Sequence, residues 1–240
     1  MVNQGLYPAE AADSFCLRPG EAARLLAGHP WQRFAVLGDS IAQGLGDPVD
    51  GYPDQPWCDR IAAELTAVQP DLAYLNLGAS NSTAARVRAR QLDAALGFSP
   101  DLALVACGGY DVLRFSYDLA GTEAELRAII GALAGTGCDV ITVGLFDGSY
   151  APALSEQLRE SLRARLHELS RRMRAVSVDL GTLHVELTWH PASRDPGLYS
   201  QDPRHGTMRG HAIAAAESIR CLGAFLGSGP ASAAQDGASL

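Results

Sequence analysis

Five short apolar runs, separated by segments with a helical repeat, constrain the fold of this chain more than any other feature. Each run is rich in Val, Leu or Ile and is bounded by Gly or Asp. Runs that are apolar at every position are typical of strands buried on both faces, as in a parallel sheet covered by helices. The predicted strands are residues 34–37, 72–77, 102–107, 140–146 and 176–180.

The segments between these runs repeat apolar residues every three or four positions, as amphipathic helices do. Strand alternating with helix predicts an α/β fold with a mostly parallel sheet. The sequence Thr122-Glu123-Ala124-Glu125 matches a capping box, which predicts that a helix begins there. Further helices are predicted at residues 21–26, 61–65, 84–96, 154–169 and 208–226.

A single domain fits the length of 240 residues, since we find no internal repeat and no interdomain linker. We place this domain at residues 31–227. Residues 1–30 are predicted to form an N-terminal extension. Residues 228–240 lack any large apolar residue before the terminal Leu and are predicted to form a flexible tail.

The charge and hydropathy exclude several classes of partner. A net charge of −8 argues against a nucleic-acid surface. No apolar run reaches the length of a membrane span, and the N-terminus lacks the features of a secretory signal. We therefore expect a cytoplasmic protein without a nucleic-acid or membrane partner. The sequence does not predict the oligomeric state.

Lysine and cysteine usage limits the chemistry further. All 19 basic residues are Arg, which excludes the phosphate-binding lysine of P-loops and any Schiff-base lysine. The number of cysteines is odd and no pair has the C-x-x-C spacing of zinc or redox sites. We expect no metal and predict reduced, structural thiols. The cysteines are Cys16, Cys58, Cys107, Cys138 and Cys221.

Ser40 is a candidate nucleophile because it directly follows the first predicted strand, at a turn into a helix. A serine at such a turn presents its hydroxyl outward at the edge of the sheet where chemistry gathers. The alternative is a helix N-cap, since Ser and Asp are preferred cap residues. The strand and turn alone favour the cap.

His205 is a candidate base, with Asp202 three residues before it and the last predicted helix after it. A nucleophilic serine needs a base, and the base needs an acceptor that fixes its tautomer. The spacing alone is weak evidence, because any surface loop can contain it. The other histidines show no metal-binding spacing and are interpreted as solvated or capping residues: His29, His167, His184, His190 and His211.

Four blocks in this order resemble the SGNH, or GDSL, hydrolases, over roughly residues 31–226. The blocks are Gly38-Asp39-Ser40, Asn76-Leu77-Gly78, Gly108-Gly109-Tyr110-Asp111 and Asp202-x-x-His205. The last continues through Gly210-His211, similar to the family's D-x-x-H-x-x-x-x-G-H ending. The resemblance implies a three-layer α/β/α sandwich with a flavodoxin-like, five-stranded parallel sheet.

The resemblance also implies a catalytic triad that acts on a small-molecule acyl substrate without a metal or organic cofactor. Ser40 would be the nucleophile, His205 the base and then the acid, and Asp202 the carboxylate that orients it. Such enzymes usually hold the oxyanion with three donors. These are the N–H of the nucleophile, a glycine N–H in the second block and an asparagine amide in the third.

Two of those donor positions depart from the family pattern. Asn81 stands where the second block usually has glycine, although Asn tolerates the left-handed conformation better than most residues. Alternatively, Gly78 supplies the donor after a local shift. Tyr110 stands where the third block usually has Asn, and a phenol is a longer donor that needs a different cavity.

Three functions remain open on these grounds. The first is a serine esterase or deacylase that hydrolyses an ester or thioester through an acyl-Ser40 intermediate. The second is an acyltransferase or another tailoring enzyme of a biosynthetic pathway. The third is a non-hydrolytic protein with this fold and a degenerate oxyanion hole. Four residues could form a pocket wall, or could simply pack: Leu145, Phe146, Tyr150 and Tyr199.

Overall fold

The computed structural model describes residues 7–202 and 204–228 and contains a central sheet of five parallel strands. The strand order is β3-β1-β4-β5-β6. The chain thus adds β3 on one side of β1 and then β4, β5 and β6 on the other side. Ligands of such sheets bind at the carboxyl ends of the strands, where the order reverses. The strands are β1 (Arg33–Gly38), β3 (Ala73–Asn76), β4 (Leu102–Ala106), β5 (Asp139–Gly144) and β6 (Leu183–Glu186).

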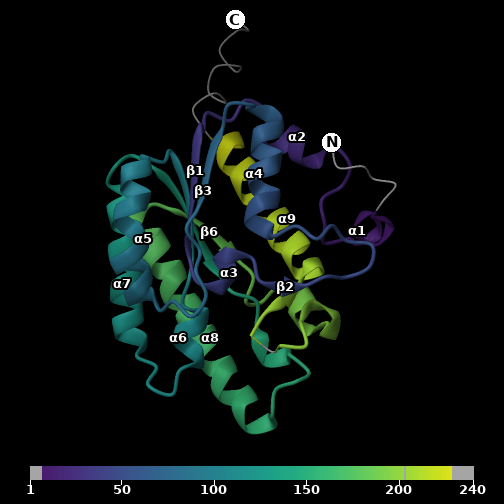
Figure 1. Cartoon of the computed structure of the whole chain (residues 1–240), viewed down its shortest axis with the longest axis vertical. Helices are drawn as coiled ribbons and strands as arrows, with labels where there is room; N and C mark the ends of the chain where they lie inside the picture. Colours follow the sequence, from purple (N-terminus) through teal and green to yellow (C-terminus); the bar gives the residue numbers. More distant parts are fainter. Residues whose placement is uncertain (1–6, 203, 229–240) are drawn as a thin grey trace, which may run out of the picture.

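Helices cover both faces of this sheet, which confirms the predicted three-layer α/β/α fold (Figure 1). Side chains of β1 alternate between the two layers: Phe34 and Val36 pack on one side, and Ala35 and Leu37 on the other. The first layer contains α2 (Glu21–Leu25), α4 (Trp57–Val68) and α9 (Met208–Gly227). The second contains α5 (Ala84–Phe98), α7 (Leu119–Ala134) and α8 (Glu156–Leu180).

Most of the short elements lie near the carboxyl ends of the strands, across the middle and lower part of Figure 1. Loops there carry few constraints from the sheet and are free to carry functional side chains. The short helices and strands are α1 (Pro8–Ala12), α3 (Ser40–Gln43), β2 (Gly46–Asp47), α6 (Gly109–Leu113) and β7 (Gly206–Thr207). Three short 3₁₀ turns span Gly148–Tyr150, Pro191–Arg194 and Pro196–Leu198.

The predicted strand at residues 176–180 is wrong, because these residues form the last turns of α8. The helical repeat that buries Leu169, Met173 and Val176 continues through this run. Gly181, with a φ of 64°, ends the helix in a left-handed conformation. The fifth strand is instead β6, a half-buried edge strand whose polar residues hide it from a search for apolar runs. The other four predicted strands are confirmed.

The predicted capping box at residues 122–125 is also wrong. Helix α7 begins three residues earlier, and Asp118 is its N-cap, accepting a hydrogen bond from the Gly121 N–H. Thr122 lies inside the first turn and donates its hydroxyl to the Asp118 carbonyl at 2.7 Å. The remaining predicted helices are present, each within or close to its predicted range.

The described part of the N-terminal extension, residues 7–30, packs on the first helical layer. Leu26 is fully buried against α4 and α9, and three ion pairs hold the segment to the rest of the chain. They are Glu10–Arg60, Asp13–Arg209 and Glu21–Arg220. Nearly all of the predicted tail, residues 229–240, lies outside the described residues. No helix in the described ranges is long and apolar enough to cross a membrane.

Candidate active site

Ser40 is the first residue of α3 and lies directly beyond the end of β1. The N-cap of this helix is Asp39, not Ser40, because the Asp39 carboxylate accepts from the Ile41 N–H at 2.9 Å. The backbone before it is tightly packed: a Cβ on Gly38 would lie 1.9 Å from the Ala106 carbonyl oxygen. The Ser40 hydroxyl is therefore not used for capping and projects from a rigid turn.

Asp39 links the ends of β1 and β4. Its fully buried carboxylate also accepts a hydrogen bond from the Tyr110 N–H at 3.2 Å. Burial raises the pKa of Asp39 to about 6; the Ile41 and Tyr110 N–H groups oppose the rise, and the nearby Asp111 carboxylate adds to it. Asp39 thus fixes the position of Ser40 relative to the block that contains Tyr110.

His205 and Asp202 form the expected pair. The His205 Nδ1 lies 3.1 Å from an Asp202 carboxylate oxygen, so a proton on Nδ1 leaves Nε2 free to accept. No hydrogen bond joins His205 to Ser40 within the described ranges, although both line one pocket. Such contacts are often long before substrate binds. Asp202 is only partly buried.

Arg204 contacts Asp202 more extensively than His205 does. Its Nε lies 3.0 and 3.2 Å from the two carboxylate oxygens, and its Nη2 lies 2.7 Å from one of them. These hydrogen bonds hold the pKa of Asp202 far below its ordinary value, with a smaller contribution from His205. Asp202 is therefore ionised throughout the working range of an enzyme.

A two-stranded sheet places the His205 loop beside Ser40. Strand β7 follows His205 and pairs with β2, which follows α3, with Gly46 opposite Gly206. The hydroxyl of Ser200 reinforces the junction by accepting from the Asp47 N–H at 3.0 Å and donating to the Gly206 carbonyl. The two segments are far apart in sequence, and this pairing brings them to one site.

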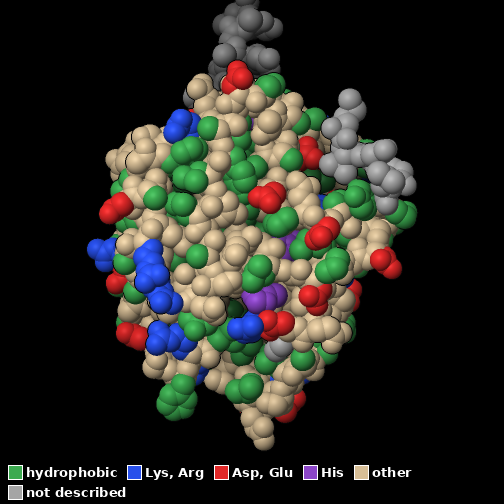
Figure 2. All heavy atoms as spheres, in the orientation of Figure 1, with side chains coloured by type: hydrophobic (Ala, Val, Ile, Leu, Met, Phe, Trp, Pro, Cys, Tyr) green, Lys and Arg blue, Asp and Glu red, His purple; other side chains and the backbone are tan. Residues whose placement is uncertain are grey.

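A pocket of about 240 Å³ opens at this site. Figure 2 shows its opening as a hollow beside a histidine, with basic and acidic side chains at the rim. The polar lining groups are few, and they include Ser40, Ser80, Asn81, Tyr110, Arg204 and His205. The apolar wall includes Val112, Leu113, Val143, Leu145, Phe146, Leu162, Leu166, Leu187, Leu198 and Ala214. Three of the four proposed wall residues line it, namely Leu145, Phe146 and Tyr199, whereas Tyr150 does not.

Gly78 does not supply a free donor. Its N–H donates to the Asn76 side-chain oxygen at 2.9 Å, and Gly78 is not among the residues lining the pocket. A Cβ at this position would lie 2.3 Å from the Gln43 backbone nitrogen. Glycine is thus required for close packing against α3, and the alternative in which Gly78 acts as the oxyanion donor is not supported.

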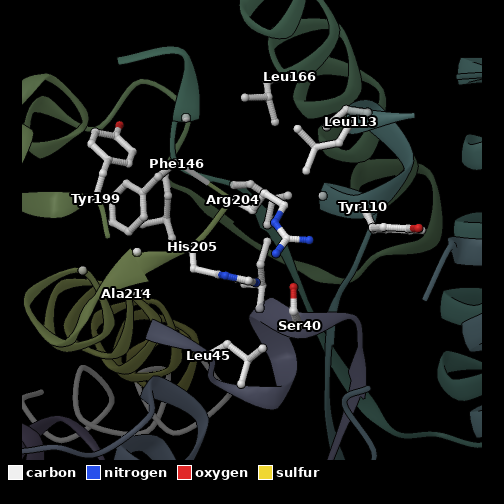
Figure 3. A pocket seen from close by; sticks show the side chains of 18 of the residues that line it. Ser40, Leu45, Tyr110, Leu113, Phe146, Leu166, Tyr199, Arg204, His205 and Ala214 are labelled. Carbon is white, nitrogen blue, oxygen red and sulfur yellow. The ribbon is translucent and has the colours of Figure 1, made fainter. Parts of the chain in front are cut away.

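Asn81 and Tyr110 both reach the pocket. Asn81 adopts the left-handed conformation expected of its glycine-like position, with a φ of 57°. The Tyr110 phenol points away from the Ser40 hydroxyl in Figure 3. The side chain that replaces the usual Asn therefore does not aim its donor at the nucleophile.

Sequence reasoning missed His211, which is buried rather than solvated. Its Nδ1 accepts from the Trp57 N–H at 3.2 Å, and its Nε2 donates to the Leu45 carbonyl at 3.2 Å. Burial lowers the pKa of His211 to about 4. A neutral His211 therefore joins α9 to α4 and to the segment after α3, and it lines the pocket. Its position three residues after Gly206-Thr207-Met208 carried no burial signal in the sequence.

Asp39 and His211 give opposite pH dependences of stability. Folded Asp39 keeps its proton at higher pH than the unfolded chain, so its contribution is present in acid and is lost as the pH rises from about 4 to about 6. The unfolded chain protonates His211 near pH 6.5 and the folded chain only near 4, so its contribution is lost as the pH falls. In the native protein the pH dependences that Asp39 and His211 contribute to the free energy of unfolding largely cancel.

Asp39→Asn is therefore expected to make the free energy of unfolding fall more steeply with acidification. Between about pH 6.5 and 4, the free energy of unfolding of the variant should fall by about 3 kcal/mol more than that of the wild type. One pKa unit corresponds to about 1.4 kcal/mol. Urea unfolding of the wild type and the variant across this window measures it. Asp71→Asn, at an exposed position, is the control and should keep the wild-type slope. Parallel curves for Asp39→Asn and wild type would contradict the assignment.

The described residues hold no group of three or more His, Cys, Asp or Glu side chains that could bind a metal ion. The pocket lining combines the hydroxyl of Ser40, the imidazole of His205 and the guanidinium of Arg204 with an apolar wall (Figure 3).

Comparison with known proteins identifies one matching family model and several solved structures with a similar fold. The model of the GDSL-like lipase/acylhydrolase family matches residues 36–213. The solved acetylxylan esterase Axe2 from Geobacillus stearothermophilus is 21% identical, with a TM-score of 0.62, covering 82% of this chain and 95% of Axe2. LAE5, an alpha/beta hydrolase enzyme from the metagenome of Lake Arreo, Spain, is 22% identical, with a TM-score of 0.64, covering 82% and 96%. No curated protein sequence matches significantly.

Proposed function

The chain belongs to the GDSL-like lipase/acylhydrolase family and is an ester-hydrolysing enzyme; on that premise we propose that it cleaves esters of apolar acyl groups through an acyl intermediate on Ser40. The observation that carries the proposal is the placement of Ser40 and the Asp202-oriented His205 on one predominantly apolar pocket. Catalytic mutants of Axe2 replace a serine, an aspartate or a histidine, with the aspartate three positions before the histidine. Asp202 and His205 have the same spacing, which supports the proposal.

The side chains can carry out both halves of the reaction. His205 Nε2 takes the proton of Ser40 as the Ser40 oxygen attacks the acyl carbon, while Asp202 holds the other ring nitrogen. The leaving alcohol then takes the proton from His205, and the acyl group stays on Ser40. A water molecule, deprotonated by the same imidazole, releases the acid and restores Ser40.

The apolar wall predicts the acyl group. Leu162 and Leu166 extend the pocket along α8, beyond Leu145 at the end of β5. An acetyl group would leave this wall uncovered, whereas a longer aliphatic chain would bury it. Each methylene that leaves water contributes about 0.8 kcal/mol, or about fourfold in kcat/KM. We therefore propose aliphatic acyl chains longer than acetyl as the substrate class.

A panel of p-nitrophenyl esters from acetate to dodecanoate tests this proposal, with Ser40→Ala run beside the wild type. We expect kcat/KM to rise about fourfold per methylene until the pocket is full, and to vanish in Ser40→Ala. Turnover that persists in Ser40→Ala would contradict the mechanism. A flat or falling profile from acetate onward would contradict the substrate class.

Filling the pocket with Leu166→Trp is expected to lower the ratio of octanoate to acetate turnover by at least tenfold. The larger side chain occupies the volume that the distal methylenes of octanoate would use. Leu158→Trp is the matched control, because Leu158 lies on the same helix with its side chain exposed. This control should keep the wild-type ratio. An unchanged ratio in Leu166→Trp would exclude α8 from the acyl site.

A further inference from the structure

The proposed mechanism needs donors for the oxyanion, and the described residues supply few. The Ile41 and Tyr110 N–H groups donate to Asp39, and the Gly78 N–H donates to Asn76. Within residues 7–202 and 204–228, the N–H groups of Ser40 and Asn81 meet no acceptor and remain available. The third donor, an Asn amide in the family pattern, is missing because the Tyr110 phenol points away from Ser40 (Figure 3).

Arg204 lines the same pocket as Ser40 and Tyr110. Its guanidinium lies above the Ser40 hydroxyl in Figure 3, between His205 and Tyr110. Half of its side chain is exposed, so a substrate at the pocket mouth can reach it. Two of its nitrogens, Nε and Nη2, are fixed on Asp202, whereas Nη1 has no acceptor in the described ranges. Asp202 thus holds the guanidinium in place and leaves its Nη1 able to donate to a substrate.

We propose that Arg204 is a catalytic residue that donates from its guanidinium to the oxyanion formed at Ser40, in place of the missing asparagine amide. This role rests on the proposed acyl-Ser40 mechanism. A charged donor makes shorter hydrogen bonds, about twice as strong as those of a neutral amide. Because Asp202 already orients the guanidinium, little reorganisation is needed when the charge develops.

The step in which Arg204 acts is the formation of the tetrahedral intermediate. The Ser40 oxygen forms a bond to the acyl carbon, its proton moves to His205 Nε2, and the carbonyl π pair moves onto the carbonyl oxygen. Arg204 donates a hydrogen bond to that oxygen and keeps its own proton. When the oxygen reforms the double bond, the C–O bond to the leaving alcohol breaks and His205 returns the proton to that alcohol.

A different role is that Arg204 only positions Asp202, and through it His205. The two roles differ in what Tyr110→Asn does. An amide at residue 110 can replace a missing oxyanion donor, but it has no means of restoring the orientation of Asp202. A double-mutant cycle on Arg204→Ala and Tyr110→Asn therefore separates the roles.

In this cycle we expect Arg204→Ala to lower kcat on p-nitrophenyl butyrate by about 100- to 1000-fold with little change in KM, the cost of one oxyanion donor. The factor by which Tyr110→Asn changes kcat should be smaller in the wild type than in the Arg204→Ala background, since Arg204 already fills the donor position. In the Arg204→Ala background Tyr110→Asn should raise kcat at least tenfold. Tyr110→Phe, which offers no donor, is the matched control and should give no gain in either background.

Three results would overturn the proposal: an equal Tyr110→Asn factor in both backgrounds, an Arg204→Ala kcat close to that of wild type, or a loss confined to KM. Arg171→Ala controls for net charge, because it also removes one exposed guanidinium, in this case from helix α8. A wild type without Ser40-dependent turnover would instead contradict the proposed function. Ser40-dependent turnover with no coupling between positions 204 and 110 contradicts only the role of Arg204.

Discussion

Ser40→Ala and His205→Ala are each expected to lower kcat by about 10⁶-fold, while the double variant loses no more than either single one. Serine and base act as one unit, because a base without its nucleophile, or the reverse, leaves only oxyanion and binding contributions. Ser40 is half-buried and uses its hydroxyl in no cap, so its removal should leave the fold intact. Initial rates on p-nitrophenyl butyrate measure the losses.

A matched control for this prediction is a second His–Asp pair in the same chain. His167 Nε2 lies 2.9 Å from the buried Asp147 carboxylate, yet neither residue lines the pocket. His167→Ala should therefore keep kcat within a few-fold of wild type. Additive losses in the Ser40/His205 double variant, or an equal loss in His167→Ala, would count against the shared covalent mechanism.

Asp202→Asn is expected to have the second largest effect, a loss of about 10⁴-fold in kcat. An amide at this position can present its NH₂ to His205 Nδ1, which favours the tautomer that protonates Nε2 and blocks proton transfer from Ser40. The change also removes the anion that fixes Arg204 at two nitrogens. The orientation of the base and the placement of the guanidinium are thus lost together.

Steady-state rates and thermal unfolding, measured on the same preparation, test the Asp202 prediction. Asp195→Asn is the control, because Asp195 is also a loop carboxylate paired with an arginine, but lies outside the pocket lining. It should retain turnover. If Asp202→Asn keeps more than a tenth of the wild-type kcat, the Asp202–His205 contact does not control the tautomer.

Much of the fold could be predicted from the sequence, since strands buried on both faces leave continuous apolar runs such as the one from Phe34 to Leu37. Edge strand β6 could not, because His184 and Glu186 interrupt it and the neighbouring run at Val176 has the same apolar character. The helical repeat running on from Leu169 was the signal that distinguishes the two.

The order of the blocks in the sequence indicated that Ser40, His205 and Asp202 would meet, and the structure places Asp202 against His205 and both Ser40 and His205 on one pocket. Three features were not accessible from the blocks. Arg204 was read only as an unspecified position between Asp202 and His205. The burial of His211 and the engaged N–H of Gly78 depend on contacts with residues distant in the sequence. Long-range packing determines such contacts, and local patterns carry no record of them.

Intact-protein mass spectrometry after exposure to an alkyl fluorophosphonate tests the central claim, that Ser40 is an activated nucleophile in an apolar acyl pocket. The reagent phosphonylates only a serine activated by its base. The wild type is expected to gain one adduct, mapped to Ser40 by peptide sequencing, with longer alkyl chains reacting faster. Ser40→Ala should gain none, and His205→Ala should react far more slowly. An unlabelled wild type, or an adduct that persists in Ser40→Ala, would contradict it.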